Sequence, residues 1–168
     1  MDKPEKDSFE EENKKYFDEK NYRTIVVGKD GIKNQDDIRE AIEALAEGKL
    51  SVEDRDEVLK QLKASNSKQL LLKSIESEKS MSKKAKLISA CWEIELDCTD
   101  HFLFFVKQAI EGDYMVAMEC LTVIENIETE IPSEELEKAK QLLSDKINDN
   151  SENAPMLEEV LSWIETRN

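Results

Sequence analysis

Apolar positions recur along most of this chain at the three- and four-residue intervals of an amphipathic helix. From Asp36 onward, Ile38, Ile42 and Leu45 mark a first helix that is predicted to end at Gly48. The later helices are predicted to begin at Ser51, Ser67, Ser80 or Ser82, Asp100, Asp113 and Pro132. A last helix follows the polar segment NDNSENAP and is marked by Leu157, Val160, Leu161 and Ile164. Short connections predict antiparallel hairpins, about four in all.

The N-terminal residues have a different character. We expect a disordered tail over 1–7, and a short helix followed by an extended linker over 8–35. Ser8 and Glu11 have capping-box spacing, and the linker contains the β-branched, then turn-like stretch TIVVGKDGIKN. Residues 36–168 are predicted to form the helical domain.

The helices share a spacing of 33–34 residues. A shift of 33 places Ala85, Leu87, Ile88, Ala90, Cys91 and Ile94 on Met118, Cys120, Leu121, Val123, Ile124 and Ile127. A shift of 34 places Leu70, Leu71, Leu72 and Ile75 on Phe104, Phe105, Val106 and Ala109. Apolar residues fall on apolar ones and polar residues on polar ones, which indicates a two-helix repeat.

The segment HFLFFV contains a run of five consecutive apolar residues, Phe102–Val106. It is far shorter than the roughly 20 residues that cross a bilayer, so no membrane anchor is predicted. The first helix of a repeat packs against its hairpin partner and against both neighbouring repeats. We therefore expect this run to be core.

The unit LLLKSIESEKSMSKKAKLISACWEI, followed by FLFFVKQAIEGDYMVAMECLTVIENI, resembles HEAT or armadillo-like repeats over residues 67–128. This resemblance implies an all-α fold, a short α-solenoid of antiparallel hairpins, whose usual role is to hold other macromolecules on a concave face. It implies no enzymatic chemistry. An alternative is a tetratricopeptide-like binder, suggested by Gly112, Tyr114 and Ala117, although that family has a small residue where this chain has Phe105.

Charge narrows the choice of partner. The formal net charge is −15, with residues 60–86 at +6 and residues 87–168 at −14. Phosphate would be repelled over most of such a surface, so nucleic acid is not expected as a partner.

The N-terminus carries no apolar signal-peptide core, and the three cysteines lie in helix-like sequence. A cytoplasmic location is therefore expected.

Cys91, Cys98, His101 and Cys120 could together supply four zinc ligands. A metal- or ligand-dependent sensor built on this group is the alternative function. Buried cysteines are common as small core residues, however, and we predict neither metal nor cofactor. The sequence has no phosphate loop, nucleophile elbow or HExxH motif, and His101 is its only histidine. We therefore predict a chain that is not an enzyme.

The function expected is protein–protein interaction, as a small adaptor or regulator. The repeat register assigns an outward stripe to the second helices of two successive hairpins. Its residues are Lys86, Ser89, Trp92 and Glu93 in one hairpin and Glu119, Thr122, Glu125 and Asn126 in the next. Trp92 would anchor a protein partner whose basic residues meet the glutamates. The sequence leaves the partner's identity and the oligomeric state open.

Overall fold

The computed structural model describes residues 31–149 and 152–167, and this part of the chain is all helical, without strands. The prediction of an all-α fold is confirmed. The helices are α2 (Gln35–Glu47), α3 (Val52–Ala64), α4 (Lys68–Ser77), α5 (Met81–Glu93), α6 (Phe102–Glu111), α7 (Tyr114–Glu125), α8 (Ser133–Asn148) and α9 (Ala154–Glu165), with a 3₁₀ turn, η1 (Thr99–His101), before α6. The predicted tail 1–7, and residues 8–30 of the predicted helix and linker, lie outside the described residues.

Side chains cap the starts of four of the described α-helices, namely α2, α3, α5 and α7. Asn34 and Asp37 form a capping box at the start of α2, and Gly48 ends that helix with φ 65°. The side chain of Ser51 accepts a hydrogen bond from the Asp54 amide at 3.1 Å. These polar side chains satisfy amides that the first helical turn leaves without backbone partners.

The start of α6 differs from the prediction that Asp100 opens it. Residues 99–101 form the 3₁₀ turn η1, and α6 begins at Phe102. The side chain of Asp100 does not cap the helix, because its carboxylate accepts from Lys68 Nζ at 2.6 Å and contacts His101 Nδ1 at 2.9 Å. Partners distant in sequence therefore outweigh the local capping preference of aspartate.

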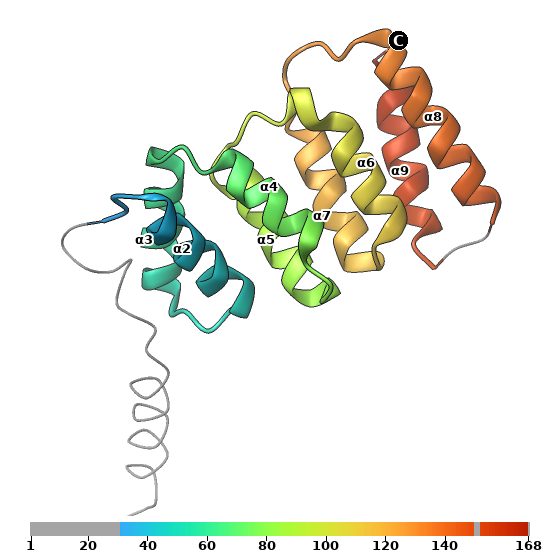
Figure 1. The fold of residues 1–168 in the computed structure, drawn as a ribbon. Coiled ribbons are helices and arrows are strands. Elements are labelled where there is room, and N and C mark those ends of the chain that lie inside the picture. Colours follow the sequence, from blue (N-terminus) through green and yellow to red (C-terminus); the bar gives the residue numbers. More distant parts are fainter. Residues whose placement is uncertain (1–30, 150–151, 168) are drawn as a thin grey trace, which may run out of the picture.

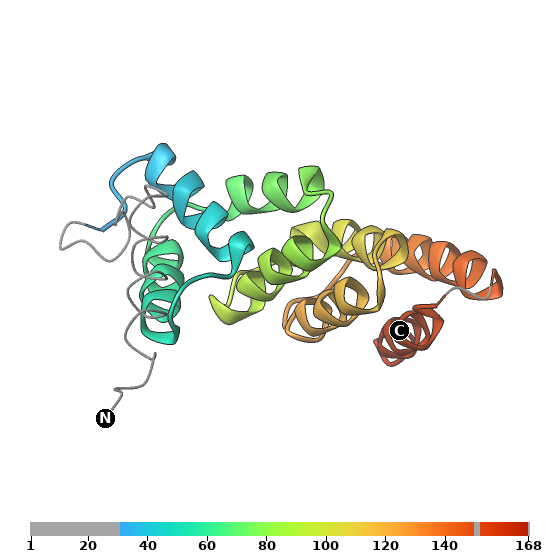
Figure 2. The same ribbon diagram turned by 90° about the horizontal axis from the view of Figure 1, so that it is seen from below.

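The helices lie in pairs, and the pairs follow one another along the molecule (Figures 1 and 2). In one layer α5 packs along α7 and α7 packs along α9, while in the other α6 packs against α8. Within pairs, α4 contacts α5, α6 contacts α7 and α8 contacts α9. The first pair departs from this pattern, because α2 rather than α3 lies against α5 and also touches α4.

One continuous apolar core runs through these pairs. Phe102 and Phe105 are fully buried, and Phe102 stacks on Trp163 of α9 with ring centroids 6.1 Å apart. The expectation that the Phe102–Val106 run belongs to the core holds for Phe102, Phe105 and Val106, whereas Leu103 and Phe104 are half-buried and pack against the core.

Burial recurs at the spacing seen in the sequence. At a shift of 34, Leu71, Leu72 and Ile75 are buried and so are Phe105, Val106 and Ala109. At a shift of 33, Leu87, Ala90, Cys91 and Ile94 are buried and so are Cys120, Val123, Ile124 and Ile127. No described helix has the length and apolar character needed to cross a lipid bilayer.

Candidate partner-binding face of α5 and α7

The predicted interaction residues lie on α5 and α7 and in the turn after α7. Both helices begin at a side-chain cap. Ser80 accepts from the Lys83 amide at 3.4 Å, and Asp113 accepts from the Val116 amide at 2.9 Å. The two helices pack directly on each other, so their outward residues share one surface, called here the α5–α7 face.

Trp92 is half-buried on this face, where its ring packs against the core. Its indole Nε1 donates a hydrogen bond to Glu119 Oε2 at 2.9 Å. Because Trp92 belongs to α5 and Glu119 to α7, this bond joins the two helices. It also satisfies the one polar atom of the indole, which a buried ring would otherwise leave unpaired.

Glu93, the next residue, binds a side chain from the first helix pair. The Arg55 guanidinium of α3 donates Nη2 to Glu93 Oε1 at 2.6 Å and Nη1 to Glu93 Oε2. The hydrogen bond with Glu93 raises the pKa of Arg55. Negative charge on Glu119 acts on Arg55 in the same direction. Arg55, Trp92, Glu93 and Glu119 thus form one group, called here the Trp92 cluster.

The remaining predicted residues divide into covered and exposed ones. Ser89 is buried and donates its hydroxyl to the Lys86 carbonyl oxygen at 2.8 Å. Lys86 reaches the Glu47 carbonyl oxygen at the end of α2, at 3.4 Å. The outward stripe predicted on α5 is therefore covered over its N-terminal half, because α2 lies there.

The C-terminal part of the stripe is more open. Glu125 and Asn126 are exposed, and Asn126 Nδ2 donates to the Thr122 carbonyl oxygen at 2.7 Å. Thr122 is half-buried and donates its hydroxyl to the Met118 carbonyl oxygen at 3.2 Å. A partner could therefore reach Trp92, Glu125 and Asn126 but not Ser89.

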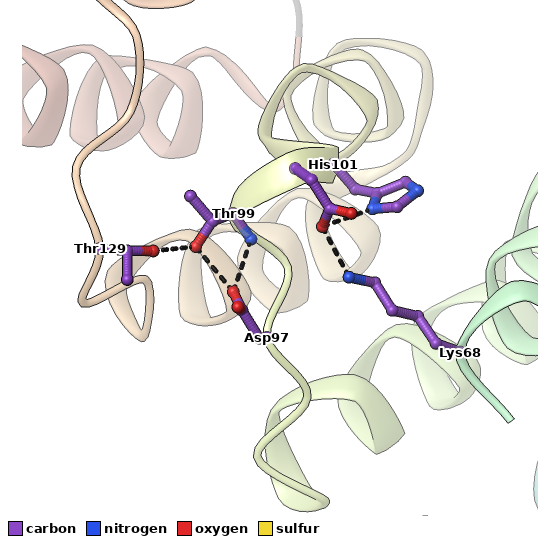
Figure 3. Close-up of polar contacts among 6 residues, drawn as sticks. Lys68, Asp97, Thr99, His101 and Thr129 are labelled. Atoms are coloured by element: carbon purple, nitrogen blue, oxygen red, sulfur yellow. Dashed lines mark hydrogen bonds and ion pairs between the residues drawn. The ribbon is translucent and has the colours of Figure 1, made fainter. Parts of the chain in front are cut away.

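The loop between α5 and α6 carries two further polar groups (Figure 3). Asp97 accepts from the Thr99 amide at 3.0 Å and from its hydroxyl at 2.7 Å, and that hydroxyl also bonds the Thr129 hydroxyl. Hydrogen bonds from Lys68 and then His101 lower the pKa of Asp100 to about 2. These contacts tie the loop to α4 and to the turn after α7.

The three cysteines and His101 do not converge on one point. Cys91, Cys98 and Cys120 are buried, free thiols, whereas His101 bonds Asp100. Within residues 31–149 and 152–167, no three His, Cys, Asp or Glu side chains form a group that could hold a metal ion. Burial raises the pKa of the Cys120 thiol above its ordinary range.

Two long-range contacts of basic side chains were not identified from the sequence. Arg55 lies 38 residues before Glu93, and no local pattern links them. Lys84 is buried and its Nζ donates to Gln108 Oε1 of α6 at 2.8 Å. The spacing in the sequence could have indicated that Lys84 is buried. It precedes Ile88 and Cys91 by four and seven residues, so it lies on the same apolar face of the helix.

Comparison of the chain with protein-family models, with curated proteins and with solved structures finds no match.

Proposed function

We propose that this chain is a non-enzymatic protein-interaction module that binds a basic segment of a partner protein on the α5–α7 face. The observation that carries the proposal is the Trp92 cluster, where the Glu93 carboxylate binds the guanidinium of Arg55 and the Glu119 carboxylate accepts a hydrogen bond from the Trp92 indole. A basic side chain of a partner would find the same chemistry beside it.

The proposed scaffold is a short α-solenoid similar to HEAT repeats. Three features support it: the two layers of α4–α9, the pairwise contacts within and between hairpins, and burial that recurs every 33–34 residues. The pair formed by α2 and α3 would be a capping repeat, since terminal repeats of solenoids depart from the regular pattern. α3 then stands at the end of the α5–α7 face and contributes Arg55 to it.

Charge complementarity supports a basic partner. The stretch from Gln108 to Glu137, both included, contains nine acidic residues and no lysine or arginine. Glu125 and Glu128 are exposed near the end of α7. The same field would repel nucleic acid, so we propose a protein partner. Free, buried cysteines are consistent with a cytoplasmic location, which we also propose.

Different residues should set the affinity for the partner and the rate of association with it. An exposed ion pair contributes only about 0.2–1 kcal/mol, so the glutamates would act mainly on the association rate and its salt dependence. Most of the affinity would come from the exposed part of the half-buried Trp92 ring.

The test is quantitative affinity capture from native lysate with the full chain as bait, followed by binding measurements with the partner identified. Trp92→Ala should weaken binding at all salt concentrations, and Glu125→Lys with Glu128→Lys should weaken it most at low salt. Circular dichroism must show that each variant is folded. Trp92→Phe keeps a ring but loses the bond to Glu119, so it separates packing from the polar contact.

The matched charge control is Glu76→Lys with Glu134→Lys. It makes the same change in net charge at exposed positions on α4 and α8, in the other layer. This control should bind the partner with nearly wild-type affinity at every salt concentration. Equal losses from both double variants would show that net charge alone drives the association, and normal binding by folded Trp92→Ala would remove the α5–α7 face as the site.

A further inference from the structure

The Glu93 carboxylate at the end of α5 is occupied by a cation of the same chain. Arg55, in the first turn of α3, donates Nη2 to Glu93 Oε1 at 2.6 Å and Nη1 to Glu93 Oε2. The exposed fraction of the Glu93 side chain is 19%, and that of the Arg55 side chain is 35%. A cation from a partner could therefore bind the Glu93 carboxylate only after Arg55 has moved away.

The geometry of this pair favours one kind of cation. A guanidinium presents parallel N–H groups in one plane, and these match the two oxygens of a carboxylate. An ammonium group is a compact point charge without this planar fork. Because both oxygens of Glu93 bind one guanidinium, the position suits an arginine better than a lysine. The negative charge of Glu119, which accepts from the Trp92 indole, also attracts a cation to this position.

Arg55 can leave Glu93 without unfolding of α3. This helix packs along α2, and its buried residues are the apolar Val58, Leu59 and Leu62. The Arg55 side chain instead extends from α3 to the end of α5. A rotation about its side-chain bonds would free Glu93 while the apolar residues of α3 stay packed.

A second ion pair joins the same two segments at a more open position. Lys63, in the last turn of α3, binds Glu95, two residues beyond Glu93. The exposed fractions of the two side chains are 53% and 77%, so water screens the attraction between them. Access to the end of the α5–α7 face therefore depends mainly on Arg55.

We propose that Arg55 is an internal competitor for the partner's site, and that an arginine of the partner replaces its guanidinium on Glu93, beside Trp92. This inference rests on the proposed function and adds two features to it. The basic segment of the partner contains an arginine that reaches Glu93. The free chain keeps this position closed, so the affinity for the partner is lowered by the free energy needed to break the internal pair.

The test uses two blocked hexapeptides of equal charge as probes, one alternating alanine with arginine and one alternating alanine with lysine. Binding to the full chain at low salt is followed by NMR through the indole Nε1–H signal of Trp92. The sequence has two tryptophans, and the signal that is lost in Trp92→Phe belongs to Trp92. We expect the arginine peptide to shift this signal at a lower concentration than the lysine peptide.

Two variants remove the competitor to different degrees. Arg55→Ala should bind the arginine peptide roughly three- to tenfold more tightly than the wild type, because no internal pair has to be broken. Arg55→Lys keeps the net charge but loses the planar fork, so it should bind the peptide about two- to threefold more tightly. Arg55→Lys is also the conservative variant if circular dichroism shows that Arg55→Ala does not fold.

The matched control is Arg39→Ala. It makes the same change in net charge as Arg55→Ala within the first helix pair, but Arg39 binds Asp36 of its own helix. The control should change the affinity for the arginine peptide by less than about twofold, since an exposed pair within α2 does not occupy the site.

A bracing role for Arg55 would give the opposite result, because loss of the brace would weaken binding. If the arginine peptide shifts the Trp92 signal but folded Arg55 variants bind it no more tightly than Arg39→Ala does, the competitor proposal is overturned and the proposed function stands. Equal affinity of Arg55→Ala for the two peptides would overturn the preference for arginine. If neither peptide shifts the Trp92 signal of the wild type or of the Arg55 variants, both proposals fail.

Discussion

Phe105 gives the most direct test of how the helices pack. Its side chain is fully buried on α6, and its ring meets that of Phe104 edge to face, with centroids 5.2 Å apart. α6 contacts α7, α8 and α9, so Phe105 belongs to a helix shared by neighbouring pairs. Phe105→Ala would leave a cavity that a helix held on several sides cannot easily close.

The magnitude follows from this burial. Truncation of a buried phenylalanine to alanine costs about 3–5 kcal/mol, of which the aromatic pair accounts for about 0.5–1.5 kcal/mol. The free energy of unfolding of ordinary domains is about 5–15 kcal/mol. The variant should therefore still fold at 25 °C, but with a much smaller free energy of unfolding. A loss of 4 kcal/mol corresponds to roughly 8–16 °C in Tm for a chain of this size.

The assay is urea unfolding followed by helical circular dichroism, with Phe104→Ala as the matched control. Phe104 is half-buried, so its truncation should cost only about 1–2 kcal/mol in lost apolar burial, besides the aromatic pair that both variants lose. Ile88→Ala, at a fully buried position on α5, should cost about 2–5 kcal/mol. A loss below about 1 kcal/mol at Phe105, or a larger loss at Phe104 than at Phe105, would refute the assigned helix faces.

Three further variants test local features by thermal and urea unfolding. Gly112→Ala should be destabilised, because an added Cβ would collide with the Val116 side chain; an unchanged Tm would mean that the turn adjusts freely. Glu95→Gly should be stabilised by about 0.5–1 kcal/mol, because φ 54° strains a residue with a Cβ, and a lower Tm would contradict this. Asp100→Asn should lose less than about 1 kcal/mol above pH 4, since the pair with Lys68 is exposed. The folded-state pKa of about 2 lies below the unfolded value, so this loss should vanish as pH falls from 4 to 2, and a loss that persists at pH 2 would exclude the carboxylate as its cause.

Helix positions were predictable where a short-range rule decides them. Ser51, Gly48 and Asp113 act within one turn of their own helices, and the structure uses all three as the sequence indicates. The apolar period of α4 to α7 likewise identifies buried positions such as Phe105 and Ile88. Asp100 was misjudged as a cap because its partner Lys68 comes from another helix.

The candidate face was only partly predictable, since it depends on contacts between distant segments. The repeat register placed Trp92 and Glu119 on one surface, but it could not show that they bond each other. The register begins at Leu70 and does not include the first helix pair. In the structure Lys86 contacts the end of α2, and α3 brings Arg55 to Glu93, which are long-range arrangements that no periodic pattern records.

The most direct test of partner binding on the α5–α7 face is site-specific photocrosslinking in native lysate. A benzoylphenylalanine at Asn126 would report on this face, and the same group at Gln141, an exposed amide on α8, would report on the other layer. We expect a specific protein crosslink from position 126 whose partner peptide is rich in lysine or arginine, with none from position 141. The same crosslinked protein from both positions, or a crosslink from position 141 alone, would contradict the proposed function.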